Sequence, residues 1–173
     1  MAIKEILKEP NIILRQISTP VDAVTDDIRA LMDDMLDTMY DAPGIGLAAI
    51  QIGVPKRIIV IDLNSAEEGQ VPAPLYFVNP VITVINPELC IYKEGCLSVP
   101  EINENVSRPA EISVSYLDYD GNPQILQTDG LLATCLQHEM DHLEGILFID
   151  RLSKFKRQLA LQKLRKLNKL KLS

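Results

Sequence analysis

The sequence predicts an α+β fold in which mixed or antiparallel sheets pack around one central helix, followed by a helical C-terminus. Two observations carry this prediction. Segments with the apolar patterns of strands occupy the middle of the chain, and a long helix with an apolar stripe follows them instead of alternating with them. The 173 residues have the length of one domain, with 47% hydrophobic residues and no internal repeat or linker-like segment.

The first predicted helix covers residues 25–40. Thr25 can cap its start, and Pro43-Gly44 ends it. We interpret its apolar stripe as a surface that packs on the core, because apolar residues recur there every three or four positions: Ile28, Leu31, Met32, Met35, Leu36 and Met39.

Two strands are predicted after a glycine-rich segment at 44–53. Residues 57–62 form an apolar run typical of a buried strand, and 75–85 form a second one. The polar, proline-containing stretch 64–74 between them predicts a loop. Pro80 cannot donate a backbone hydrogen bond, so the second strand must break there or lie at a sheet edge.

A hairpin is predicted later in the chain. Residues 111–118 alternate between apolar and polar side chains, 118–122 form a turn, and 124–127 can return as the partner strand. The polar stretch 101–107 before it predicts an irregular segment.

Two helices complete the prediction. The central helix runs from about 129 to 144, and Gly145 is well placed just beyond its end. The last helix covers roughly 153–170. We therefore expect residues 1–150 to form one catalytic domain, with 151–173 as a basic helix packed on it or extending from it.

The segment 137–145 contains both histidines of the chain, His138 and His142. Four residues make just over one helical turn, so both imidazoles leave the same face of the helix. In this His-Glu-x-x-His pattern two histidines hold a metal ion, while Glu139 handles protons for a metal-bound water. The alternative is an ordinary helix that happens to carry two histidines.

A catalytic site of this kind needs a third protein ligand. Downstream of the motif the only acidic residues are Glu144, which points to another side of the helix, and Asp150, which lies beyond it. Cysteine is the remaining option.

Three cysteines compete for this role. Cys135 shares the helix face of the first histidine, but three ligands from one helix would strain a tetrahedral site. Cys90 lies in a strand-like context and is expected to be buried in the core. Cys96 follows Gly95, which lets the backbone approach closely. On spacing alone, Cys96 is only modestly favoured over Cys135.

Three segments together resemble the signature motifs of the peptide deformylase family: Gly44-Ile-Gly-Leu-Ala-Ala-Ile-Gln51, Glu94-Gly-Cys-Leu-Ser98 and Gln137-His-Glu-Met-Asp-His-Leu-Glu-Gly145. The resemblance spans about residues 10–150. It implies an enzyme that removes the N-formyl group from the initiator methionine of new bacterial or organellar polypeptides and releases formate. A metal-bound hydroxide would attack the formyl carbon, because the metal lowers the pKa of water from ~15.7 toward ~7.

The resemblance also implies roles for individual residues. Cys96, His138 and His142 would hold one divalent metal, usually Fe²⁺ and often replaced by Zn²⁺, Ni²⁺ or Co²⁺. Glu139 would be the general acid and base. The donors to the developing oxyanion would be the Gln51 side chain and the Leu97 backbone N–H, and the residues lining the substrate cleft would be Ile45, Gly46, Tyr92, Gly95, Leu131 and Cys135.

One residue departs from the family pattern. Asn103 stands where several members carry arginine, which puts a cationic contact to the peptide beyond methionine in question. Two other functions stay open for the metal motif. A zinc endopeptidase would cleave within peptides without needing Cys96, and a non-catalytic metal-binding module would use four protein ligands.

Charge is divided unevenly along the chain. Residues 151–173 hold nine of the 17 Lys/Arg residues and none of the acidic ones, so residues 1–150 carry a formal charge of −16. An acidic body argues against DNA binding. The basic helix is expected either to pack by its leucines or to dock on the ribosome, and association with a membrane surface is the weaker alternative.

The remaining expectations concern location and assembly. No apolar run approaches the roughly 20 residues of a membrane span, and the N-terminus lacks the pattern of a secretory signal. Three cysteines are too few for a disulfide scaffold. We expect a cytoplasmic monomer that acts on N-formylmethionyl peptides and does not insert into a membrane.

Overall fold

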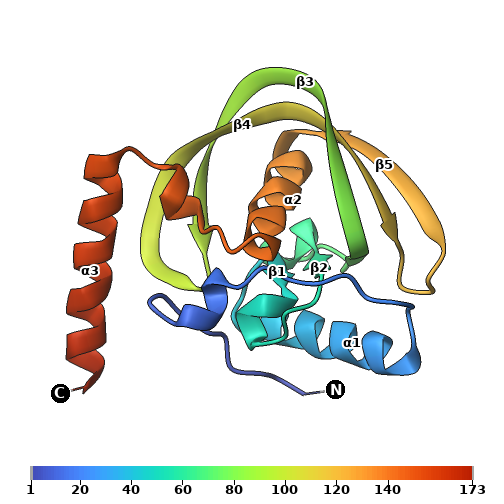
Figure 1. The fold of residues 1–173 in the computed structure, drawn as a ribbon, viewed down its shortest axis with the longest axis horizontal. Coiled ribbons are helices and arrows are strands. Elements are labelled where there is room, and N and C mark those ends of the chain that lie inside the picture. Colours follow the sequence, from blue (N-terminus) through green and yellow to red (C-terminus); the bar gives the residue numbers. More distant parts are fainter. Residues whose placement is uncertain (1, 173) are drawn as a thin grey trace.

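The computed structural model describes residues 2–172, which form three α-helices and one five-stranded sheet (Figure 1). The helices are α1 (Asp26–Asp41), α2 (Gly130–Leu143) and α3 (Lys154–Leu172). The strands are β1 (Gly46–Ala48), β2 (Ile58–Ile61), β3 (Leu75–Cys96), β4 (Val99–Leu117) and β5 (Pro123–Asp129). The predicted α+β class is confirmed.

The sheet is antiparallel and follows the order of the chain, β1-β2-β3-β4-β5. Its two longest strands, β3 and β4, arch over α2, so that the helix lies beneath a curved sheet (Figure 1). Four shifts in the β3–β4 register accompany this curvature, because a bulge bends a strand and increases its twist.

The prediction of an irregular segment at 101–107 was wrong. These residues belong to β4 and pair with the second half of β3, for example Val106 with Tyr92. Ile102 and Val106 are buried in the cluster beneath α3, whereas Asn103 and Asn105, which alternate with them, are exposed. The sequence of the segment alone did not reveal its partner strand. Cys90, expected to be buried, is only half-buried.

Pro80, where a break or an edge position was predicted, lies in a kink of β3, which continues through it. Asn79 adopts a left-handed backbone conformation with φ of 51°, and the β3–β4 register shifts between Val78 and Val81. The Asn79 side-chain amide is hydrogen-bonded to both the N–H and the carbonyl of Val21, each at 2.8 Å. These bonds hold the kinked backbone in place.

Helix α1 begins and packs as predicted. The Thr25 side chain accepts a hydrogen bond from the Ile28 N–H, which caps the first turn. Met32, Met35 and Met39 are fully buried in a cluster with residues of β1 and β2. The glycine-rich segment before β2, for which no element was predicted, forms β1 and a short 3₁₀ turn over Ala49–Ile52.

Helix α2 ends at Leu143, and the predicted glycine, Gly145, lies just beyond it. Gly145 has a φ of 74°, and a Cβ at this position would lie 2.5 Å from the carbonyl oxygen of Arg15. Leu136 and Leu143 are fully buried with the side chains of the sheet. The helix is therefore fixed between β1 and the arch.

Helix α3 stands at one side of the molecule, away from α1 and β5 (Figure 1). Ala160 and Leu164 are its buried side chains among the described residues, and they join Val99 and Ile102 in one cluster. Within residues 2–172 no helix combines the length and apolar character that crossing a membrane requires.

Candidate active site

Three potential metal ligands converge between α2 and the end of β3. His138 and His142 lie one turn apart on α2 and are buried, and Cys96 is the last residue of β3. Their candidate donor atoms all lie within 4.8 Å of one another. Cys96 Sγ is 3.3 Å from His142 Nε2.

The other candidates for the third ligand are engaged elsewhere. Asp150 forms ion pairs with Arg15 and with an arginine on α3. Glu144 pairs with Arg57 at 2.8 Å. Cys135 is not a member of the donor cluster found among the described residues. Burial raises the pKa of its thiol well above the usual value, which keeps it protonated.

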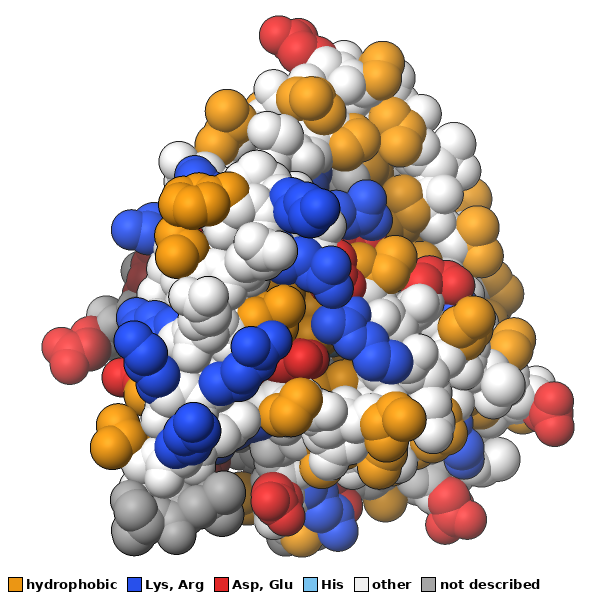
Figure 2. All heavy atoms as spheres, turned by 60° about the vertical axis from the view of Figure 1, so that its left-hand side comes forward, with side chains coloured by type: hydrophobic (Ala, Val, Ile, Leu, Met, Phe, Trp, Pro, Cys, Tyr) orange, Lys and Arg blue, Asp and Glu red, His pale blue; other side chains and the backbone are white. Residues whose placement is uncertain are grey.

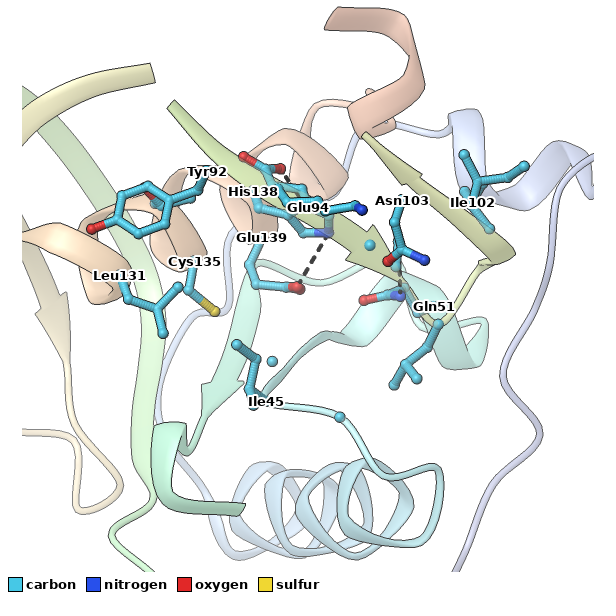
Figure 3. Close-up of a pocket in the computed structure, with 18 of the residues that line it drawn as sticks. Ile45, Gln51, Tyr92, Glu94, Ile102, Asn103, Leu131, Cys135, His138 and Glu139 are labelled. Carbon is cyan, nitrogen blue, oxygen red and sulfur yellow. Dashed lines mark hydrogen bonds and ion pairs between the residues drawn. The ribbon is translucent and has the colours of Figure 1, made fainter. Parts of the chain in front are cut away.

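Glu139 lies beside the cluster and points into the same pocket as His138 (Figure 3). Its Oε1 is 3.7 Å from His138 Nε2, and its buried Oε2 has no hydrogen-bond partner within the described part of the chain. Burial raises the pKa of Glu139 to about 7, with the charge of His138 opposing and that of Glu94 adding to the shift. A carboxyl group with this pKa can both take up and release a proton near neutral pH.

A pocket of about 370 Å³ opens in front of these groups, a size in the range of small-ligand sites. Figure 3 shows Tyr92, Leu131 and Cys135 at one end and Gln51 and Asn103 at the other. All the predicted site residues except His142 line this pocket: Ile45, Gly46, Gln51, Tyr92, Gly95, Cys96, Leu97, Leu131, Cys135, His138 and Glu139.

Gln51 is buried and fixed at both ends of its amide. Its Oε1 accepts the Ala48 N–H at 2.9 Å, and its Nε2 donates to Ser98 Oγ at 3.0 Å and lies 3.6 Å from Cys96 Sγ. Leu97 is in the tight turn that joins Cys96 to β4. The predicted oxyanion donors are therefore both close to Cys96, one in space and one as the next residue of the chain.

The sequence analysis missed a buried group of charges behind the metal cluster. Glu94 accepts two hydrogen bonds from Arg108, at 2.7 and 2.9 Å, and its Oε1 is 2.9 Å from His138 Nδ1. Burial would raise the pKa of Glu94, but the hydrogen bonds from His138 and Arg108 hold it below the usual value. Glu94 stood inside the second motif, whereas nothing in the sequence near Arg108 linked it to the site.

Gly46 allows β1 to approach α2 closely. A Cβ at this position would lie 3.0 Å from Cys135 Sγ and 3.2 Å from Glu139 Cγ. The first glycine-rich motif therefore has a steric role beside the pocket.

The cluster has the composition and setting of a catalytic metal site. One thiolate and two imidazoles suit Zn²⁺, Fe²⁺ and related divalent ions. Three ligands leave a coordination position free, and a carboxyl group with an unpartnered oxygen stands beside them. The fold and the site together define a metal-dependent hydrolase.

Comparison with known proteins identifies the family. The family model for polypeptide deformylase matches residues 3–158. The chain is 62% identical over 167 residues to a peptide deformylase of Pelagibacter ubique, covering 96% of each chain. A peptide deformylase crystal structure from Ehrlichia chaffeensis superposes with a TM-score of 0.92 at 42% identity, covering 99% of this chain and 100% of that one. One from Legionella pneumophila gives 0.89 at 44% identity, covering 99% and 98%.

The chain therefore belongs to the peptide deformylase family. It is a hydrolase that removes the N-formyl group from nascent polypeptides. The structure provides a site for one divalent metal ion.

Proposed function

We propose that Cys96, His138 and His142 hold one Fe²⁺ ion and that Glu139 is the general acid and base of deformylation. The observation that carries this proposal is the convergence of the three donors within 4.8 Å of one another beside a buried carboxyl group. Zn²⁺, Ni²⁺ and Co²⁺ suit the same donor set. Metal analysis of protein purified without oxygen distinguishes these ions.

When bound, the metal ion would supply Lewis acidity toward the formyl oxygen and a water molecule. Glu139 accepts the proton that the attacking water loses and delivers it to the leaving amine. Its pKa of about 7 supports both directions of transfer, and its unpartnered Oε2 is free to receive the proton.

Gln51 and Leu97 serve as donors to the oxyanion of the tetrahedral intermediate. Gln51 Nε2 carries two hydrogen atoms: one is bonded to Ser98 Oγ, and the other, which is directed at Cys96 Sγ from 3.6 Å, is the one that would turn to the oxyanion. Because the amide is already held by Ala48 and Ser98, it needs little reorganisation during the reaction. Each such donor contributes roughly 3–4 kcal/mol of transition-state stabilisation.

The apolar end of the pocket receives the methionine side chain. Tyr92, Leu131 and Cys135 line this end (Figure 3). Ile45, Gly46 and Gly95 also line the pocket and would flank the path of the peptide backbone. Asn103 gives the opposite end of the pocket a neutral amide, so we expect no charge-based preference there for the peptide beyond methionine.

Formate release from formyl-Met-Ala-Ser tests these roles. Glu139→Gln should reduce kcat by ~10²–10⁴ while metal content is retained, because only proton transfer is removed. Cys96→Ser should lose both metal and activity. Glu144→Gln, just beyond the end of the same helix and paired with Arg57, is the control and should stay active. Full activity in Cys96→Ser, or cleavage inside longer peptides, would favour the endopeptidase instead.

We further propose that α3 docks the enzyme on the ribosome as an extension of a catalytic domain formed by residues 1–150. Lys and Arg side chains gather on the face that α3 presents (Figure 2). Phe155 and Leu159 are 69% and 49% exposed there. The combination of cations and apolar side chains suits an anionic surface such as ribosomal RNA with protein.

A charge reversal tests docking without removing the helix. Lys166→Glu with Lys169→Glu alters two exposed positions and should abolish salt-sensitive ribosome binding while formyl-peptide turnover is unchanged. Deletion of 153–173 is the stronger variant. Equal ribosome binding by all three proteins would refute the proposal, and binding to anionic vesicles alone would favour a membrane surface. Sedimentation should give a monomer, and cell fractionation should place the enzyme in the cytoplasm.

A further inference from the structure

A line of charged side chains leads from the surface across α2 to His138. Arg151 is 47% exposed, whereas Asp141, Arg108 and Glu94 are nearly buried, at 11%, 5% and 6%. Each of them is bonded to the next. The line therefore connects a surface arginine to one of the two imidazoles that can bind the metal ion.

The inner end of this line fixes the tautomer of His138. Glu94 Oε1 lies 2.9 Å from His138 Nδ1, and the same carboxylate accepts Nε and Nη2 of Arg108. An ionised carboxylate can only accept hydrogen bonds, so Nδ1 must carry the hydrogen. Nε2 is then the nitrogen that can bind a cation.

The outer end balances the buried charge. Arg108 is bonded to two carboxylates, Glu94 and Asp141, because its Nη1 also donates to Asp141 Oδ2 at 2.9 Å. Its single positive charge would not balance both. Arg151 supplies the second cation, donating from Nε to Oδ2 at 3.1 Å and from Nη2 to Oδ1 at 2.7 Å. Without Arg151, Asp141 would attract the Arg108 guanidinium more strongly. The two hydrogen bonds from Arg108 to Glu94 would then weaken.

Arg151 also belongs to a segment that touches His138 directly. It ends the 3₁₀ turn Phe148–Arg151, and the Phe148 ring is stacked on His138 with ring centroids 5.9 Å apart. This four-residue turn therefore acts on His138 in two ways. Phe148 packs on the face of the imidazole ring, and Arg151 is linked through Asp141 and Arg108 to the carboxylate that is bonded to Nδ1.

We propose that Arg151 is a positioning residue for deformylation, acting through Asp141, Arg108 and Glu94 to hold His138 in the tautomer and orientation that bind the metal ion. The inference rests on the proposed role of His138 as a ligand. Groups that orient a metal-binding imidazole typically change metal affinity about 10–100-fold when removed. Arg151 is three residues further out along the line than Glu94, which contacts the imidazole itself, so we expect the lower end of that range.

The test compares Arg151→Met with Arg157→Met. Arg157 is a matched control, because it is 46% exposed and pairs with Asp150, outside the line. Chelator competition should give a Zn²⁺ dissociation constant about tenfold higher for Arg151→Met and within about twofold of the parent for Arg157→Met. Arg151→Lys, which keeps the charge but not the two-pronged contact, should restore part of the affinity.

Imidazole NMR supplies a readout that a general loss of stability would not produce. The chain has two histidines, so the Zn²⁺-loaded protein gives two imidazole signals. The Nδ1–H of His138 should exchange faster in Arg151→Met than in Arg157→Met, while the metal-free proteins unfold at similar temperatures. If Arg151→Met does not fold, Asp141→Asn tests the same line. Equal Zn²⁺ affinity and equal exchange in the two arginine variants would overturn the inference. Imidazole signals that do not respond to Zn²⁺ would instead refute the ligand assignment itself.

Discussion

Helices α2 and α3 are both amphipathic, but they use their polar residues in opposite ways. Nine of the 14 residues of α2 are buried, including both histidines and two carboxylates, and two of these groups, His138 and Asp141, are bonded to charged partners inside the protein. Helix α3 buries Ala160 and Leu164 among its described side chains and leaves its lysines outside. Buried polar groups must be satisfied internally and become precisely placed, whereas exposed cations stay available to a partner.

Arg108→Met disrupts the buried charges beside α2 and should have the largest effect on the free energy of unfolding. It removes the cation between Glu94 and Asp141, and an uncompensated buried charge typically costs about 3–5 kcal/mol. Urea unfolding of the metal-free protein measures the loss. Lys156→Met, which breaks an exposed pair between α3 and Glu104, should cost less than about 1 kcal/mol. Similar losses in both variants would contradict the contrast.

Leu164→Ala tests how strongly α3 depends on the one leucine that is buried among its described side chains. Leu164 is 3% exposed in the cluster shared with Val99 and Ile102. Truncation should cost about 2–3 kcal/mol, and hydrogen exchange should place that loss in the opening of α3. The half-exposed Leu159 provides the matched control, since Leu159→Ala should change little. Equally accelerated exchange in α2 would mean that the two helices unfold together.

Gly46→Ala tests how closely β1 fits against α2. The new methyl group would meet Cys135 Sγ at 3.0 Å and Glu139 Cγ at 3.2 Å. Overpacking of this kind should lower the free energy of unfolding by about 1–3 kcal/mol. If the displaced Glu139 also costs about 1.4 kcal/mol of transition-state stabilisation, kcat/KM for formate release falls tenfold. A second substitution, Cys135→Ala, removes the sulfur and should recover part of the activity. No recovery would show that the clash with Glu139 dominates.

Tyr40→Phe changes stability at a distance from both helices and should have the smallest effect. Burial and the hydrogen bond to Asp62 raise the pKa of Tyr40 above its usual value of about 10. The unfolded chain therefore loses this proton first, so the stabilisation is complete below about pH 10 and falls as the pH rises further.

The variant should lose about 1 kcal/mol at neutral pH and decline less steeply above pH 10. Chemical unfolding across pH 8–11 measures both effects, and formyl-peptide turnover at pH 7 should be unchanged. If the free energy of unfolding falls as steeply above pH 10 in the variant as in the parent, the fall comes from the other tyrosines whose pKa is raised by burial.

The comparison also separates what was predictable. Local patterns sufficed for α1 with its Thr25 cap, for α2 with Gly145 beyond its end, and for the irregularity at Pro80. They failed at 101–107, because a polar strand is stabilised by pairing with its neighbour, here the end of β3, and its own residues carry little strand signal.

By itself the sequence determined the metal motif, because two histidines and a glutamate on one turn of a helix lie together wherever that helix packs. Their resemblance to a known family supplied Cys96 and Gln51. Only the tertiary structure decided that Cys96, and not Cys135, completes the cluster. It alone revealed the line from Arg151 to His138, since ion pairs between residues 14 and 33 positions apart leave no local pattern. Such contacts form only when the arch closes over α2 and buries their charges together.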